Sequence, residues 1–387
     1  PQDYYGYCNI YCSPNKEVTM RFQCSSSEMS AALGVVTRAL SPRASSPIYE
    51  GVLLVTCPEG VRLTCTDLAL GIETHIDAQV QDEGSVVLPG KLFSEIVRKL
   101  PDGMMDLSVD DRNVATIRCA GSRMTLAGMD PEEFPALPEV ENPSVIKIEQ
   151  NTFRDMVQRT SFAIATDETR IILTGCLLET EGSNLYLVAL DGFQLALRKH
   201  ACEEELPKLS AVVPGKVLGE LAKILEDSDE AVELHFGKSY LTADVGPTRV
   251  VARLLEGEFI RYRQILPQDW KTRVRVSRRE LDAAVDRAAL MARENKNNLI
   301  KMHIGDSEML ITSNAELGDV REEVPVTSEG HDLDIAFNVR YIADTLRAIE
   351  DDEVLIRFNS NVSPCLFCPV EGDNYLYLAL PVRVFSA

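Results

Sequence analysis

A segment with the same pattern occurs three times along this chain. PGKLFSEIVRKL begins at Pro89, PGKVLGELAKIL at Pro214 and NVRYIADTLRAI at Asn338, so the copies stand 125 and 124 residues apart. So steady an offset over a whole chain indicates that a domain-sized unit has been repeated. With 387 residues, the chain has room for three such units, each able to bury its own core. The predicted domains are residues 20–142, 143–269 and 270–387.

The first nineteen residues fit none of the repeats. PQDYYGYCNIYCSPNKEVT holds four of the eleven tyrosines, and it lacks the basic and then apolar segments of a signal peptide. We interpret residues 1–19 as a leader or tag, expected to be disordered, and take Met20 as the natural start.

Each repeat reads as helix, strands, helix, strands, which predicts an α+β fold with few helices on one face of antiparallel sheets. The first helices are expected over 25–40, 151–164 and 277–290, with Ser25, Asn151 and Ser277 as N-caps. Alternating strands follow over 60–74, 184–197 and 308–324, and near their middle Asp67, Asp191 and Asn314 indicate turns. After the second helix, two more strands are expected, for example over 114–120 and 122–129.

The second helices carry a basic pair at the same place in every repeat. On a helical wheel Lys91 and Arg98 share one side, opposite an apolar side made of Leu92, Phe93, Ile96, Val97 and Leu100. The pair recurs as Lys216 with Lys223 and as Arg340 with Arg347, and the first helices add Arg38, Arg154, Arg159, Arg279 and Arg287. These cations indicate an anionic partner. The alternative is that they are solvated cations in ion pairs with Glu95, Glu220 and Asp344.

The net charge of −21 limits what kind of anion can bind. An acidic protein repels nucleic acid from most of its surface, so tight reading of a DNA sequence is disfavoured. A basic inner lining with an acidic exterior instead suits a protein that surrounds a polyanion without gripping it. The acidic runs at 203–205, 226–230 and 350–353 are then solvated outer turns rather than metal ligands.

No motif for catalysis, cofactor binding or membrane insertion stands out. Ten irregularly spaced cysteines are typical of free thiols in a reducing cytosol. Cys365 and Cys368 are the best metal or redox signal, but only Cys8 and Cys12 could supply a second zinc pair. Nucleotide-binding loops, zinc-protease and serine-hydrolase motifs are absent, as is any apolar stretch of about 18 residues. We therefore expect no catalytic residues, no metal and no cofactor.

Several motifs together resemble one family, the bacterial DNA polymerase III beta subunit, or sliding clamp. They are the joint PEEFPALPEVENPS from Pro131, ATDETRIILTG from Ala165, FNVRYIADTL from Phe337 and LALPVR from Leu378, and the resemblance covers residues 20–387. It implies a non-enzymatic processivity factor of DNA replication. In that family, two three-domain chains close head to tail into a ring around duplex DNA, with helices lining the hole and sheets outside.

The resemblance also implies three sets of site residues. The DNA-facing set is Arg38, Arg43, Lys91, Arg98, Arg154, Arg170, Ile171, Ile172, Lys216, Lys223, Arg340 and Arg347. A peptide groove between the second and third domains comprises Leu173, Leu190, Gly192, Phe193, Gln194, Leu195, Ile260, Gln264, Ile265, Leu378, Leu380, Pro381, Val382 and Arg383. The dimer interface takes Arg123, Met124 and Leu126 from one chain and Leu290 and Met291 from its partner.

The groove departs from the family pattern at several positions. Phe193 and Gln194 replace a frequent His-Arg pair, Ile260 a frequent Pro, and Gln264 a frequent Arg. The groove should therefore be less basic and more apolar than in the family.

The implied partners are double-stranded DNA, DNA polymerase III, other polymerases, the clamp loader and repair proteins, together with a second copy of the chain. The implied location is the cytoplasm, away from membranes. Two other functions remain open: a cytosolic repeat scaffold that binds peptides but not DNA, and a thiol enzyme using Cys365 and Cys368.

Overall fold

The computed structural model describes residues 18–41, 46–294 and 298–383. Arg43 and most of the predicted leader lie outside the described residues. Contacts divide the chain into two compact units, which are described separately. Unit 1 is Pro1–Glu139 with Asp244–Val251, and unit 2 is Val140–Ala243 with Ala252–Ala387.

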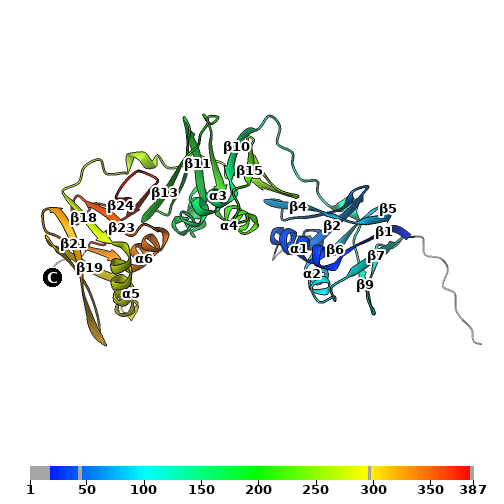
Figure 1. Ribbon diagram of the computed structural model, residues 1–387, viewed down its shortest axis with the longest axis horizontal. Coiled ribbons are helices and arrows are strands. Elements are labelled where there is room, and N and C mark those ends of the chain that lie inside the picture. Colours follow the sequence, from blue (N-terminus) through cyan, green and yellow to red (C-terminus); the bar gives the residue numbers. More distant parts are fainter. Residues whose placement is uncertain (1–17, 42–45, 295–297, 384–387) are drawn as a thin grey trace, which may run out of the picture. The chain divides into compact units, whose positions relative to one another are not determined.

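The threefold repeat is present in the element order (Figure 1). Each repeat consists of two copies of a strand, a helix and three strands, with one extra short strand in the first repeat. The first repeat contains β1 (Val18–Ser25), α1 (Ser26–Val36), β2 (Gly51–Cys57), β3 (Gly60–Thr66), β4 (Leu70–Asp77), β5 (Gln79–Asp82), β6 (Ser85–Pro89), α2 (Gly90–Arg98), β7 (Met104–Asp110), β8 (Val114–Cys119) and β9 (Ser122–Ala127).

The other two repeats follow the same order. The second contains β10 (Ser144–Glu149), α3 (Gln150–Gln158), β11 (Gly175–Glu181), β12 (Asn184–Leu190), β13 (Gln194–Ala201), β14 (Ser210–Pro214), α4 (Gly215–Ile224), β15 (Ala231–Phe236), β16 (Tyr240–Val245) and β17 (Thr248–Arg253). The third contains β18 (Thr272–Ser277), α5 (Arg278–Glu294), β19 (Leu299–Ile304), β20 (Glu308–Ala315), β21 (Gly318–Gly330), β22 (Leu333–Asn338), α6 (Val339–Ala348), β23 (Glu353–Phe358), β24 (Cys365–Pro369) and β25 (Tyr375–Ala379).

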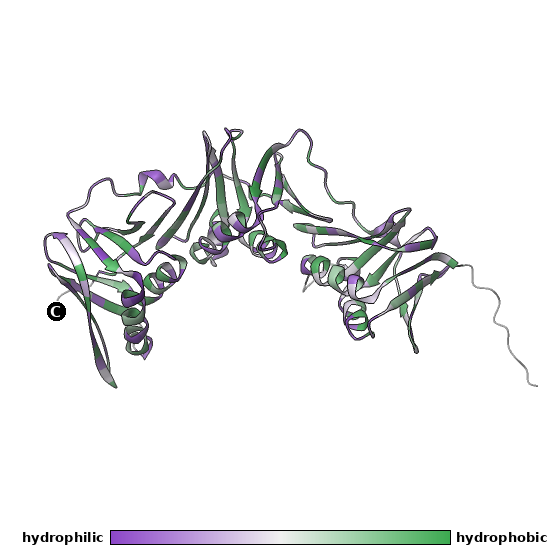
Figure 2. Ribbon diagram, in the orientation of Figure 1, coloured by the Kyte–Doolittle hydropathy of each residue, from purple (hydrophilic) through white to green (hydrophobic). Residues whose placement is uncertain are grey.

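Antiparallel sheets form the body of each unit, which confirms the α+β class. Unit 1 contains two sets of hydrogen-bonded strands, one in the order β5-β1-β7-β8-β9 and the other in the order β6-β2-β3-β4. Helix α1 packs against β4 and against α2. In unit 2, twelve strands form one sheet in the order β14-β11-β12-β13-β25-β24-β23-β18-β21-β20-β19-β22. Apolar and polar residues alternate along many of these strands (Figure 2), as expected for sheets with one face covered by helices.

The strand pair β13–β25 joins the second repeat to the third. Leu195 lies opposite Leu378 and Gln194 opposite Ala379 in an antiparallel register. Because both strands belong to unit 2, residues far apart in the sequence meet at this junction. The pairing places the end of β25 beside the turn that precedes β13.

Two first helices are shorter than predicted. α1 ends at Val36 and α3 at Gln158, each followed by a short 3-10 turn. At both ends a threonine hydroxyl donates to the carbonyl four residues earlier, from Thr37 to Leu33 at 2.6 Å and from Thr160 to Met156 at 2.8 Å. Such bonds compete with the helical pattern. α5 instead runs to Glu294, beyond its predicted end.

The predicted caps and turns have mixed outcomes. Ser25 caps α1 as expected, whereas α3 has Glu149 at its N-cap and Asn151 lies inside the helix, so that prediction was wrong. Asp67 and Asp191 do form turns, each accepting two backbone N–H bonds. Asn314 was misplaced, because β20 continues through it to Ala315.

The strand count after the second helices was also too low. Three strands follow each of them rather than two. No helix in the described part of the chain combines the length and the apolar character needed to span a bilayer.

Candidate functional site

The repeated basic pairs lie on exposed faces of the second helices. Lys91 and Arg98 on α2, Lys216 and Lys223 on α4, and Arg340 and Arg347 on α6 are all exposed. Phe93 and Val97 are buried on the other side of α2, as predicted, but Leu92 is 49% exposed and its assignment to the apolar side was wrong. The helices therefore present their cations to solvent while their apolar faces pack inward.

Ion pairs distinguish these basic residues from one another. Lys223 lies 2.8 Å from Glu220, and Asp344 pairs with both Arg340, at 3.6 Å, and Arg347, at 3.3 Å. The ion-pair alternative therefore applies in the second and third repeats. Within the described residues, Lys91 and Arg98 form no such pair.

The other predicted DNA-facing residues have varied surroundings. Arg38 and Arg154 are half-buried, and Arg154 pairs at 3.1 Å with Asp227 of the acidic run at 226–230, whose acidic residues are all exposed. Arg170 and Ile171 are exposed in the 3-10 segment Glu168–Thr174, whereas Ile172 packs against the apolar cluster of the groove.

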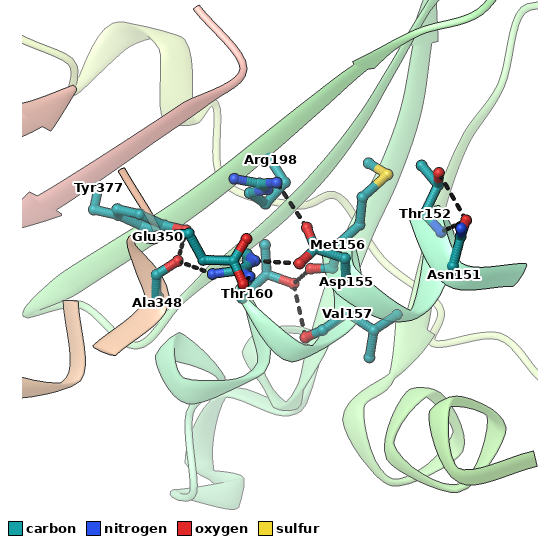
Figure 3. A network of polar contacts seen from close by, with 11 residues as sticks. Asn151, Thr152, Asp155, Met156, Val157, Thr160, Arg198, Ala348, Glu350 and Tyr377 are labelled. Carbon is teal, nitrogen blue, oxygen red and sulfur yellow. Dashed lines mark hydrogen bonds and ion pairs between the residues drawn. The ribbon is translucent and has the colours of Figure 1, made fainter. Parts of the chain in front are cut away.

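A polar network joins the second repeat to the third, and Figure 3 shows Asp155 and Arg198 of the second repeat near Ala348, Glu350 and Tyr377 of the third. The Arg159 guanidinium pairs with Asp155 and Glu350 and donates to the carbonyl of Ala348 at 2.7 Å. Asp155 also accepts from Arg198 at 2.7 Å. Since the Arg159 side chain is only 13% exposed, it is a connecting residue rather than a free surface cation.

Tyr377 completes this network. Burial raises the pKa of its phenol to about 12. The phenol is therefore protonated near neutral pH, and it lies 3.4 Å from the carbonyl of Ala348, to which it donates. The network thus fixes the end of α6 against α3 and β25.

The predicted groove residues from distant segments gather in one place in unit 2. An apolar cluster brings together the buried Leu173, Leu190, Leu195 and Leu378, with Ile172, Ile260 and Leu380 packed against it. The β13–β25 pairing and the bond from the Leu380 amide to the Phe193 carbonyl, 2.8 Å long, hold the two sides together. Predicted groove residues from three distant segments therefore belong to one apolar cluster.

Phe193 provides an exposed aromatic surface beside this cluster. Its side chain is 58% exposed, and its ring stacks on that of Tyr341 in α6. Gly192 precedes it with φ +98°, a conformation that side chains other than glycine rarely adopt. The sequence analysis did not include Tyr341; its place within FNVRYIADTL was the available signal.

Gln194 points away from the groove surface. It is buried, and its amide nitrogen donates to the Phe162 carbonyl and to Asp191, both at 3.2 Å. Its interactions therefore hold the turn in place rather than offering a hydrogen bond to a ligand.

Three of the predicted groove residues, Ile260, Gln264 and Ile265, come from the segment between the second and third repeats. Gln264, the last residue of the 3-10 turn Tyr262–Gln264, and Ile265 after it are exposed. Arg263 anchors this turn by pairing with Glu179 at 2.7 Å and by lying over the rings of Tyr186 and Tyr262. At the end of the described chain, Pro381 is half-buried and Val382 and Arg383 are exposed.

The predicted dimer residues lie on one edge strand, β9, and one helix, α5. β9 ends its sheet, with Arg123 exposed, Met124 half-buried and Leu126 buried. In unit 2, Leu290 is 59% exposed on α5 and Met291 is half-buried. An exposed leucine on a helix and an unfilled strand edge are features of an interface.

Cys365 and Cys368 lack the features of a reactive thiol site. Cys365 and Cys368 are buried in β24, and burial raises the pKa of both thiols. A thiol held protonated and away from solvent is a poor nucleophile, which disfavours the thiol-enzyme alternative. Residues 18–41, 46–294 and 298–383 hold no group of three or more His, Cys, Asp or Glu side chains suited to a metal ion.

Comparisons with family models and with known proteins agree on one family. Models of the N-terminal, central and C-terminal domains of the DNA polymerase III beta subunit match residues 20–138, 147–260 and 263–383. A Beta sliding clamp from Staphylococcus epidermidis is 35% identical over 358 residues, covering 90% of this chain and 95% of the relative.

Solved structures agree with these matches. The DNA polymerase sliding clamp of Bacillus subtilis has a TM-score of 0.92 and 32% identity, covering 95% of this chain and all of that one. A sliding clamp of Pseudomonas aeruginosa bound to griselimycin has a TM-score of 0.89 and 28% identity over the same shares.

Proposed function

The chain belongs to the DNA polymerase III beta-subunit family, the sliding clamps, and we propose that it works through the basic helix faces and the apolar groove described above. Members of this family are non-catalytic processivity factors of DNA replication. This chain is accordingly a sliding clamp that tethers the replicative polymerase to duplex DNA.

The basic faces are the proposed DNA surface. The observation that carries this assignment is the exposed cation pair at the same place on α2, α4 and α6. In a closed ring, DNA leaves only when the ring opens, so individual phosphate contacts can be weak and short-lived. Weak contacts suit a protein with a net charge of −21, and they permit sliding.

Ring closure requires a second copy of the chain. Two strand edges support a head-to-tail arrangement: β9 ends its sheet in unit 1, and residues 318–325 of β21 pair with β20. The second half of β21 pairs with β18 instead. Among the strands that the structure describes, the first half thus has an edge to which β9 of a partner can add.

The apolar groove is the proposed docking site for peptide segments of DNA polymerase III, other polymerases, the clamp loader and repair proteins. Its proposed residues include the buried leucines of the apolar cluster and the exposed Phe193 and Ile265. Exposed apolar side chains beside an apolar cluster can accept the side chains of an extended peptide. The griselimycin complex of the Pseudomonas aeruginosa clamp supports the proposal, since this relative binds that ligand.

The cytoplasm is the proposed location. The eight cysteines of the described residues are all free thiols, which agrees with a reducing compartment.

Retention on circular DNA tests the clamp function. The protein is loaded on nicked circular duplex by an ATP-driven clamp loader, washed in high salt and then exposed to a nuclease that linearises the circle. We expect retention before the cut and release after it, because salt removes proteins held only by phosphate contacts. Loss of the protein during the wash, or retention after the cut, would contradict encirclement.

A further inference from the structure

The three repeated basic pairs differ in the charges that surround them. Residues 90–103, which hold α2 and the turn after it, contain three basic and two acidic residues. Residues 215–230, with α4 and its turn, contain two basic and five acidic residues, and residues 339–353, with α6, contain the same numbers. The first repeat is therefore the only one of the three whose second helix and following turn carry a net positive charge.

Side-chain geometry strengthens this difference. On α4 Glu220 pairs with Lys223, and on α6 Asp344 pairs with both Arg340 and Arg347. Arg347 gains a further acidic neighbour, Asp286 of α5, at 3.5 Å.

On α2 the corresponding acidic residue is Glu95, which is exposed. Among the ion pairs of the described residues, none links Glu95 to Lys91 or Arg98 within 4.0 Å. Lys99, at the end of the helix, adds a further exposed cation. A phosphate approaching α2 therefore meets cations that are not already engaged.

Paired and unpaired cations do not offer the same interaction with DNA. A phosphate gains from a cation by releasing the counterions condensed on DNA, and a carboxylate already beside the cation reduces that gain. The carboxylate also repels the phosphate, over a range of about 8 Å at physiological salt. The acidic turns after α4 and α6 act in the same direction.

We propose that Lys91 and Arg98 of the first repeat are the main phosphate contacts of this clamp, and that α4 and α6 form a weakly attractive wall along which DNA slides. The proposal rests on the encirclement proposed above, and it assigns unequal roles to three helices that the repeat makes look equivalent. DNA phosphates would then be contacted mainly by the first repeat of each chain.

Sliding speed on DNA measures these contacts. Labelled rings are loaded on stretched duplex DNA, and their one-dimensional diffusion coefficient is measured for the wild type, Lys91→Ala/Arg98→Ala and the matched variant Lys216→Ala/Lys223→Ala. Removing the main contacts should raise the diffusion coefficient about twofold or more, because each lost phosphate contact lowers the friction. The α4 variant should change it by less than half as much.

A third variant, Asp344→Asn, tests whether a neighbouring carboxylate weakens the contact between a cation and a DNA phosphate. Since it frees Arg340 and Arg347 from their shared carboxylate, the ring should diffuse more slowly than the wild type. Equal effects of the two double variants, or no slowing by Asp344→Asn, would overturn the proposal. Retention on closed circular DNA is scored in parallel, because its loss in the wild type would overturn encirclement rather than the ranking of the contacts.

Discussion

The ring of Phe193 stacks on the ring of Tyr341, with centroids 6.0 Å apart and ring planes 12° apart. The two residues come from different repeats, Phe193 from the turn before β13 and Tyr341 from α6. Phe193 replaces a residue that is often histidine in the family, and it remains 58% exposed after stacking. The pair therefore gives the proposed groove an aromatic surface to which both the second and the third repeat contribute.

Replacing Phe193 by alanine should weaken peptide binding. An apolar or aromatic peptide side chain that packs on the exposed Phe193 ring gains about 1 kcal/mol, so losing the ring should raise Kd about fivefold. Fluorescence anisotropy with a labelled polymerase tail peptide measures this change. Leu317→Ala is the control, because Leu317 is an exposed leucine outside the groove, at 83% exposure. An unchanged Kd for Phe193→Ala would exclude the stack from the binding surface.

Arg159→Ala should destabilise unit 2. The substitution removes a mostly buried guanidinium that bonds Asp155, Glu350 and the Ala348 carbonyl, at a cost of about 2 kcal/mol. Urea unfolding followed by the fluorescence of Trp270, the single tryptophan, reports on this unit.

Arg261→Ala is the matched control for that experiment. Arg261 pairs with Glu258, but both side chains are more than 70% exposed, so the pair contributes little. Equal urea midpoints for Arg159→Ala and Arg261→Ala would show that the Arg159 network does not stabilise the junction between the repeats.

The repeat and the fold class were predictable because the hydrophobic pattern recurs with a constant period. Helix ends were less predictable, since Thr37 and Thr160 act through local hydroxyl bonds that compete with the helix. The basic faces of the second helices were also predictable from the sequence, because helical spacing fixes which side chains share a face.

Long-range contacts could not be predicted in the same way. The partner of Arg159 at Ala348 is 189 residues away, and no local pattern indicates it. Tyr341 looks like any aromatic residue of an amphipathic helix until Phe193 is placed beside it. The groove itself came from the family resemblance, whereas the inward direction of Gln194 needed the structure.

Leu290→Asp should produce monomers. Leu290 is 59% exposed on α5, and a carboxylate there would have to be buried without a partner when two chains meet. Sedimentation velocity should show one peak at the mass of a single chain for the variant and at twice that mass for the wild type. Leu68→Asp, at a leucine that is 55% exposed in the first repeat, is the control and should remain dimeric. A dimeric Leu290→Asp protein would refute the placement of the interface.

The thiols of β24 should be protected in the folded protein. With Cys8 and Cys12 replaced by serine, a thiol-specific reagent at pH 8 should label the half-buried Cys57 and Cys202 first. Cys365 and Cys368 should react only after urea unfolding, because burial raises their pKa and blocks access. Mass spectrometry of the labelled peptides identifies each site. Rapid labelling of Cys368 in the native protein would reopen a thiol-based function.

The ion pair between Arg287 of α5 and Glu322 of β21 should make stability depend on acid pH. Two bonds join the side chains, at 2.9 and 2.6 Å, and the bonded guanidinium lowers the pKa of Glu322. A lowered pKa means that the folded state favours the charged carboxylate. The contribution is therefore complete above the ordinary glutamate pKa of about 4.3, and it is lost as the pH falls through the lowered value.

Glu322→Gln isolates this contribution. The difference in urea midpoint between the wild type and the variant should stay constant from neutral pH to about pH 5.5, then shrink as the pH falls below the ordinary glutamate pKa. In an Arg287→Ala background, the same substitution should show no such pH dependence, because the cation that lowers the pKa is gone. A difference that persists in that background would assign the effect to another neighbour of Glu322, while a difference that grows on acidification would contradict the direction of the shift.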